Sequence, residues 1–366
     1  MPGTRRSFRF GIVGERIRSR ERLLAEARRA EALGYATLLL RDHFIGDPFG
    51  DQLAPMVALM AAAAATTRLR VGSLVLDNDY RHPVLLAKEA ATLDVLSGGR
   101  FELGLGAGWL REEYERAGIP FDPPAVRVSR LEESLRVLKG LLAEPCLTFR
   151  GEHYQVTRMC NFPRPVQQPR PPILVGAGSR RMLQLAGREA DTVGILPKAL
   201  PSGTLSEDLA ERSPETVARK VDWVRRAAAD RPGGVELSMM VSVMVTDHPR
   251  PAAERAAVER GWGAAAGERV LEMPSVLIGP VDRISEQLQT RRDRYGFSYL
   301  VVSDEDMEPF APVVDRLAGH EGVVTLPRRF GERAVGCDQA LCGCNRPGAM
   351  SPRTGRCCRE LTMSGR

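Results

Sequence analysis

Three ionisable side chains, Arg41, Asp42 and His43, directly follow the apolar run 38-LLL-40. A histidine titrates near neutral pH and can therefore give and take protons in a reaction. The same residues could also form a surface turn, an ion pair or a metal site. Adjacent strand residues point to opposite faces, so Asp42 and His43 are not expected to act in line. At a strand end, one side chain can face a cavity while the other anchors the loop.

A second candidate is the segment 176-GAGS-179, which is followed by Arg180. Closely spaced backbone N–H groups at a helix start, with an arginine alongside, suit a phosphate. The alternative is a tight turn in which Ser179 only caps the helix. The segment lacks the G-x-G-x-x-G spacing of a dinucleotide-binding loop, as does the glycine run 104–108.

The sequence lacks the motifs of several other kinds of catalytic and metal-binding site. The sequence has no H-x-x-x-H, C-x-x-C, G-x-S-x-G or P-loop pattern, so we predict no metal site and no serine nucleophile. What remains is acid–base chemistry or redox chemistry carried by a cofactor. The cysteines of the last thirty residues match no standard zinc spacing, and an oxidation-prone, disordered extension is the favoured interpretation.

Composition excludes further classes of function. The net charge is +6, but Arg and Glu alternate along helical stretches, as on solvated helix faces, and aromatic residues make up only 5%. We therefore expect no nucleic-acid binding. No signal-peptide apolar region and no stretch of about 18 apolar residues is present, so we expect a cytoplasmic protein without membrane contact. Only Cys146 and Cys160 lie in the main body, which fits a reducing compartment.

Strands and helices must alternate to position these residues. Continuous Val, Ile and Leu runs predict strands buried on both faces. They are Phe8–Val13, Ala36–Leu40, Leu69–Leu76, Phe101–Leu105, Ile173–Val175, Thr192–Leu196, Glu236–Val245 and Tyr299–Val302. Apolar stripes at helical spacing predict the helices. They are Arg20–Leu33, Pro83–Leu96, Arg127–Leu142, Arg180–Glu189, Glu215–Ala229, Val281–Tyr295 and Met307–Leu317.

Eight such units favour an α/β fold of the (β/α)8 TIM-barrel class, with loop insertions and an irregular C-terminal tail. We predict a barrel over residues 1–319 and a disordered Cys-, Arg- and Gly-rich tail over 320–366. The gap from Gly106 to Pro172 is longer than one helix requires, and a second excursion runs from Pro197 to about Ser213. Long loops after barrel strands build substrate sites, so His43 is expected at the mouth of the barrel.

The block 69-LRVGSLVLDNDYRHPVLLAKEAATLDVLSGGRFELGLGAGW-109, together with 37-TLLLRDHF-44 and residues 172–195, resembles the bacterial luciferase-like superfamily. It is most similar to the class that uses the deazaflavin coenzyme F420. The resemblance covers about residues 8–317. It implies a TIM barrel with the coenzyme ring at the C-terminal mouth, where hydride moves between C5 and a small organic substrate.

The resemblance also implies roles for individual residues. His43 matches a base or proton shuttle near C5, and Asp42 matches its neighbour in the site. Ser73-Leu74 matches a non-proline cis peptide that bulges against the ring. The expected coenzyme contacts are Ser73, Leu74, Leu76, Asn78, Ala107, Gly108, Gly176, Ala177, Gly178 and Ser179.

One position departs from the sugar-phosphate dehydrogenases of this class, which carry an acidic residue after the fourth-strand glycines. Here that residue is Trp109, whose indole cannot donate a proton as a carboxylic acid would. We expect Trp109 to wall an apolar pocket or stack on a flat substrate. Glu112 or Glu113, one turn further on, could take the place of that acid, but carboxylates on a helix surface are expected to be solvated.

The sequence therefore predicts an F420-dependent oxidoreductase, and the resemblance makes a homodimer plausible. The alternative is a reduced-FMN-dependent monooxygenase on the same barrel, supplied by a partner reductase. The partner enzyme expected beside the substrate is a flavin or F420 reductase. A barrel that binds a ligand without catalysis is a third interpretation. Neither the substrate nor the direction of hydride transfer is encoded in a recognisable motif.

Overall fold

Eight parallel strand positions close into a barrel in the computed structural model, which describes residues 6–15 and 17–319. The strand order is β3-β2-β1-β13-β10-β9-β8-β5-β4, and β3 also pairs with β5 to close the ring. The strands are β1 (Arg9–Gly14), β2 (Thr37–Leu40), β3 (Arg70–Ser73), β4 (Leu76–Asp77), β5 (Phe101–Gly106), β8 (Ile173–Ala177), β9 (Thr192–Ile195), β10 (Glu236–Met240) and β13 (Phe297–Ser303). The predicted (β/α)8 barrel is confirmed.

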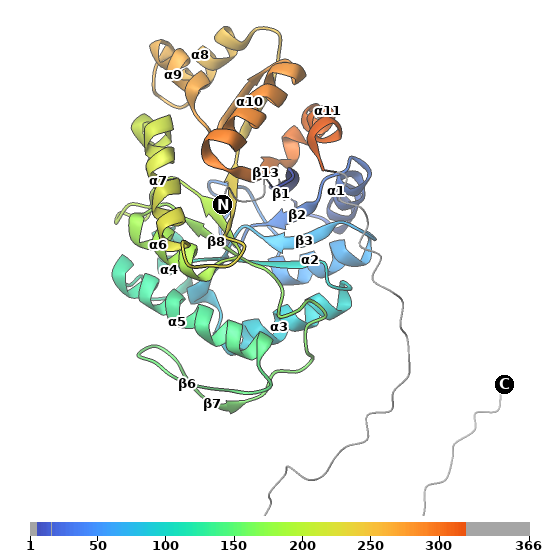
Figure 1. Cartoon of the computed structure of the whole chain (residues 1–366), viewed down its shortest axis with the longest axis vertical. Coiled ribbons are helices and arrows are strands. Elements are labelled where there is room, and N and C mark those ends of the chain that lie inside the picture. Colours follow the sequence, from blue (N-terminus) through green and yellow to red (C-terminus); the bar gives the residue numbers. More distant parts are fainter. Residues whose placement is uncertain (1–5, 16, 320–366) are drawn as a thin grey trace, which may run out of the picture. The chain divides into compact units, whose positions relative to one another are not determined.

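Helices surround the barrel (Figure 1). They are α1 (Arg20–Ala32), α2 (Pro55–Ala64), α3 (Pro83–Leu96), α4 (Arg111–Ala117), α5 (Pro124–Ala143), α6 (Arg180–Glu189), α7 (Pro214–Ala227), α8 (Pro249–Glu259), α9 (Gly267–Glu272), α10 (Val281–Tyr295) and α11 (Met307–Leu317). Four predicted helices have their predicted bounds: Pro83–Leu96, Arg180–Glu189, Val281–Tyr295 and Met307–Leu317. Two of them are marked locally at both ends, α3 by Pro83 and Ser97-Gly98 and α10 by Pro280 and Gly296. Helices α2, α4, α8 and α9 were not predicted.

Two predicted strands are interrupted. The run Leu69–Leu76 divides into β3 and β4, and Glu236–Val245 divides into β10 and β11 (Ser242–Val245). Strand β11 leaves the barrel and pairs in parallel with β12 (Val276–Gly279), which was not predicted. A four-residue apolar run gives too weak a local signal to distinguish such a strand from the start of a buried helix.

The long excursion after β5 contains an antiparallel hairpin of β6 (Leu147–Arg150) and β7 (Gln155–Met159). Cys146 and Cys160 are joined by a disulfide at the open end of this hairpin. The expectation of a reducing compartment did not anticipate that bond. The predicted tail, residues 320–366, lies outside the described residues.

The barrel interior is filled in layers. At the end where the strands begin, Arg9 bridges Glu102 and Glu236 at 2.6 and 2.7 Å. Above this ionic layer, side chains from strands that are not neighbours in the sheet pack together, which places them inside the barrel. They are Val13, Leu39, Leu174, Tyr299 and Val301, with Leu74, Val75 and Met240 packed against them. These last three face the cavity described next.

Candidate active site

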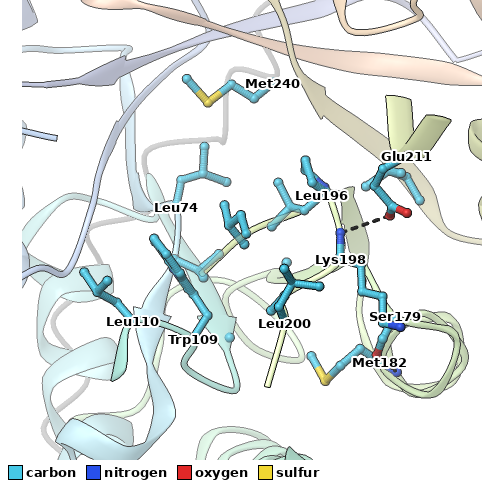
Figure 2. A pocket seen from close by; sticks show the side chains of 18 of the residues that line it. Leu74, Trp109, Leu110, Ser179, Met182, Leu196, Lys198, Leu200, Glu211 and Met240 are labelled. Atoms are coloured by element: carbon cyan, nitrogen blue, oxygen red, sulfur yellow. Dashed lines mark hydrogen bonds between the residues drawn. The ribbon is translucent and has the colours of Figure 1, made fainter. Parts of the chain in front are cut away.

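A cavity of about 840 Å³ lies at the ends of the barrel strands and is enclosed by the loops that follow them. The residues after β2, β3, β5, β8, β9 and β10 all contribute to its lining, as expected for the C-terminal mouth of this fold. Figure 2 shows Leu74 and Trp109 on one side, with Lys198, Glu211 and Ser179 on the other. Apolar side chains dominate its floor, so the cavity suits a flat organic ring.

Most of the residues chosen from the sequence line this cavity. They are Asp42, His43, Leu74, Leu76, Ala107, Gly108, Trp109, Gly176, Gly178 and Ser179. Ser73, Asn78 and Ala177 do not line it. Ser73 Oγ instead exchanges two hydrogen bonds with the backbone of Gly104 on β5, both at 2.9 Å. Asn78 is buried against Tyr154, and Ala177 is buried in β8.

His43 is held by a carboxylate. Its Nδ1 lies 3.0 Å from Glu113 Oε2, and Tyr80 Oη donates to the same oxygen at 3.0 Å. The other oxygen of Glu113 accepts the backbone N–H groups of Phe44 and Ile45. Burial would raise the pKa of Glu113, but His43 and these two N–H groups outweigh it and hold that pKa below its ordinary value. Glu113 is therefore an acceptor, which makes Nδ1 of His43 the donor.

The expectation that Glu112 and Glu113 are both solvated is wrong for Glu113, which is only 1% exposed. Glu112 is exposed and pairs with Arg116 on the same helix. Helix α4 turns its Glu113 and Tyr114 side inward, and Tyr114 is fully buried. The large aromatic side chain of Tyr114, next in sequence, was the available signal that this side of the helix faces inward.

Asp42 takes the anchoring role. Its carboxylate forms an ion pair with Arg81 and also accepts the backbone N–H of Asp77 at 3.0 Å. Asp42 is 5% exposed and ties the end of β2 to the segment that follows β4. The structure thus separates the two neighbours, with His43 paired across to α4 and Asp42 fastening the wall of the cavity.

The non-proline cis peptide lies one residue later than expected, between Leu74 and Val75 rather than between Ser73 and Leu74. The N–H of Leu74 still bonds to Leu40 on the neighbouring strand at 2.8 Å, so regular pairing continues through that residue. The strand is interrupted only afterwards. Leu74 and Val75 both line the cavity, and Val75 reaches close to Gly106 and Gly176.

The glycine-rich segment forms the turn from β8 into α6. Ser179 is the N-cap of α6, and its Oγ accepts the N–H of Met182 at 3.4 Å. A Cβ on Gly178 would overlap the backbone oxygen of Pro197, so only glycine fits there. Arg180, the expected cation, does not line the cavity and lies over the ring of Trp223 instead. Lys198 lines the cavity in its place, from the excursion after β9.

Aromatic rings gather around His43. Its ring centroid lies 4.9 Å from that of Phe49 and 6.0 Å from that of Trp109. Arg41 lies over the ring of Phe49 at 4.1 Å and forms an ion pair with Glu15 at 2.6 Å. The acidic position of the sugar-phosphate dehydrogenases is thus occupied by part of an aromatic wall beside His43.

Buried charges that were not selected from the sequence also lie at the cavity. Burial raises the pKa of Asp77 to about 7, and Tyr114 Oη donates to both of its oxygens at 2.8 Å. Burial lowers the pKa of Lys220, although Glu211 accepts a hydrogen bond from its amine. Asp77 was available as a signal, since it directly follows the predicted strand Leu69–Leu76.

Two kinds of feature are absent from the part of the chain that the structure describes. In residues 6–15 and 17–319, no group of three or more His, Cys, Asp or Glu side chains is arranged to hold a metal ion. Within the same ranges, every helix is too short or too polar to cross a membrane.

Comparison with known proteins gives the family. The model of the luciferase-like monooxygenase family matches residues 8–313. The chain belongs to this family. The luciferase-like proteins that it matches include enzymes with two different cofactors. It is 29% identical over 219 residues to the FMNH2-dependent dimethylsulfone monooxygenase of Pseudomonas putida, covering 60% of this chain and 56% of that one. It is also 29% identical over 212 residues to the F420-dependent glucose-6-phosphate dehydrogenase of Amycolatopsis mediterranei, covering 55% and 63%.

The matched region spans 56% and 63% of the length of these two curated relatives. Among solved structures, the fold is similar to the monooxygenase RslO1 of Streptomyces bottropensis, with 23% identity, a TM-score of 0.67, and coverage of 84% and 99%. It is also similar to the coenzyme F420-dependent tetrahydromethanopterin reductase of Methanopyrus kandleri, with 18% identity, a TM-score of 0.66, and coverage of 85% and 100%. Both structural likenesses concern the fold.

Proposed function

We propose that this luciferase-like protein is an F420-dependent oxidoreductase that transfers hydride between the deazaflavin C5 and a small organic substrate. The observation that carries the proposal is the buried His43–Glu113 pair at the wall of the cavity. Hydride transfer to a carbonyl, or from an alcohol, moves a proton as well. A histidine held by a carboxylate is suited to that proton transfer.

The residues present fit the coenzyme. Leu74, Val75 and Met240 offer an apolar floor for a flat ring. Gly106 and Gly176 line the cavity beside Val75, and a Cβ on either would lie within 3.5 Å of that side chain, so glycine keeps this wall of the cavity uncrowded. The turn at Ser179, with Lys198 across from it, suits the coenzyme phosphate.

Each side chain then has a defined task. The bound coenzyme supplies hydride chemistry at C5. Because Nδ1 of His43 is committed to Glu113, Nε2 is the ring nitrogen that exchanges a proton with the substrate. Trp109 and Phe49 lie beside the His43 ring and wall the substrate pocket. Asp42 acts as a positioning residue through Arg81.

A reduced-FMN-dependent monooxygenase with a partner reductase is the second candidate, because the P. putida and A. mediterranei relatives are equally similar at 29% identity. Titration of the purified protein with F420 and with FMN separates the two. We expect F420 to bind, and its turnover to proceed without oxygen consumption. Tight FMN binding without F420 binding, with oxygen consumed when a reductase is added, would establish the second candidate instead. If His43→Ala leaves F420-linked turnover unchanged, His43 has no catalytic role.

We also propose a homodimer. Large apolar side chains are exposed on α2, on α3 and after β7, at Val57, Leu85, Leu96 and Phe162. The proposal rests on the resemblance to this family, and these side chains are the candidates for the interface. Light scattering of the purified protein should give twice the mass of one chain. A single-chain mass at micromolar concentration would reject the dimer.

A further inference from the structure

A second cavity, of about 350 Å³, lies between α10 and the segment that joins α9 to β12. Figure 1 shows α9 and α10 gathered with α8 at one end of the view. The two cavities share no lining residue, although Pro274 lines this one and the next residue, Ser275, lines the first. The second cavity is therefore a separate space with its own side chains.

The buried end of this cavity contains an uncompensated cation. Arg291 is 8% exposed, and its Nη2 donates to the backbone oxygen of Val276 at 2.6 Å. Its Nη1 is buried without a partner, and no carboxylate of the described residues forms an ion pair with Arg291. Burial lowers the pKa of Arg291 to about 10 despite the neighbouring Tyr295. A buried charge without a counter-ion raises the free energy of the folded protein, so a bound anion would stabilise this site.

Gln287 adds a second unpartnered atom. Its Oε1 is buried and accepts no hydrogen bond. Gln287 and Arg291 are four residues apart on α10, so their side chains are neighbours on one face of the helix. Both line the cavity. At this cavity Arg291 thus has one unpartnered donor and Gln287 one unpartnered acceptor.

We propose that this cavity binds a phosphate monoester through its phosphate group. A singly protonated phosphate supplies an anionic oxygen to Nη1 of Arg291 and a P–O–H donor to Oε1 of Gln287. Sulfate and carboxylate anions provide acceptors but no donor. The rim carries Arg283 and Arg294 together with Glu272 and Glu286, which offer both donors and acceptors to the organic part of the ester.

Calorimetric titration of the full chain with inorganic phosphate, glycerol phosphate and sulfate tests the proposal. We expect both phosphates to bind at least 10-fold more tightly than sulfate at pH 6. Binding of glycerol phosphate should weaken by pH 8, because its second pKa is about 6 and the P–O–H donor is lost above it. Equal affinity for sulfate, or exclusion of glycerol phosphate, would overturn the proposal.

Variants locate the binding. Arg291→Met should weaken phosphate binding at least 10-fold, and Gln287→Leu should remove the preference for phosphate over sulfate. Thr290→Glu adds a negative charge at the exposed rim without altering the buried groups, so it should also weaken phosphate binding. This variant replaces Arg291→Met in the test if Arg291→Met fails to fold. Ser179→Ala, in the first cavity, is the matched control and should leave this binding unchanged. Phosphate binding that is lost in Ser179→Ala and retained in Thr290→Glu would place the anion in the first cavity and reject the site.

Discussion

Nδ1 of His43 lies 3.0 Å from Oε2 of Glu113, across 70 positions of the chain. The contact joins the end of β2 to helix α4, which follows β5. It fixes the orientation of the imidazole and commits one of its two nitrogens. Trp109 stands where the sugar-phosphate dehydrogenases have an acid, and no carboxylate takes that position here. A carboxylate four residues later supports the histidine instead.

Replacing Glu113 tests this support. Glu113→Gln keeps the size of the side chain but removes the charge that holds His43, so we expect turnover to fall by about 10- to 100-fold. Glu112→Gln is the matched control, because Glu112 is an exposed neighbour on the same helix and should retain near-normal turnover. Steady-state kinetics and coenzyme titration measure both variants. Equal activity of the two variants would show that Glu113 does not support catalysis.

The Asp42–Arg81 ion pair is expected to stabilise the wall of the cavity. Removing one partner of a buried pair leaves an uncompensated charge, so Asp42→Asn should lower the free energy of unfolding by about 3 kcal/mol. Glu308→Gln, which breaks the exposed pair with Arg29, should lower the free energy of unfolding far less, because solvent screens that pair. Urea denaturation compares them. Similar losses in both variants would argue against a structural role for Asp42.

Alanine substitutions at two glycines distinguish the cost of backbone strain from the cost of steric overlap. Gly108 and Gly118 have φ values of 73° and 68°. An added Cβ on Gly118 meets nothing within 4 Å, whereas one on Gly108 would overlap the hydroxyl of Tyr114. We expect Gly118→Ala to cost about 1 kcal/mol of stability, and Gly108→Ala to cost more and also to weaken coenzyme binding. Equal effects on stability would mean that Tyr114 moves away freely.

The pKa of Asp77 predicts a dependence of stability on pH. Its folded value of about 7 lies above the value of about 4 expected for an unfolded aspartate. Between these values the folded chain binds more protons than the unfolded chain, so the contribution of Asp77 to stability falls as pH rises. Asp77→Asn still accepts a hydrogen bond from Tyr114 but cannot ionise.

The free energy of unfolding of the wild type, relative to Asp77→Asn, should therefore decrease between pH 4 and pH 7 by an amount on the order of a few kcal/mol. Chemical denaturation of both proteins at four pH values across this range measures the difference. Asp222→Asn, at an exposed position of α7, should follow the wild type. A constant difference between wild type and Asp77→Asn would contradict the burial argument.

Local signals in the sequence determined the eight strands and most of the helices. They also marked the end of β2 as a candidate catalytic position. Hydrophobic period, helix caps and glycine turns act over a few residues, so they can be interpreted without knowledge of the fold. Gly178 and Ser179 belong to this group, since the turn from β8 into α6 needs them whatever lies opposite.

Only the tertiary structure decided which side chains meet. Closure of the barrel brings α4 against the end of β2, and this turns Glu113 from an expected surface carboxylate into the partner of His43. In the closed barrel, Lys198 lines the cavity and Arg180 does not. Contacts between segments tens of residues apart depend on how the strands are arranged around the barrel, and no periodicity within one segment records that arrangement.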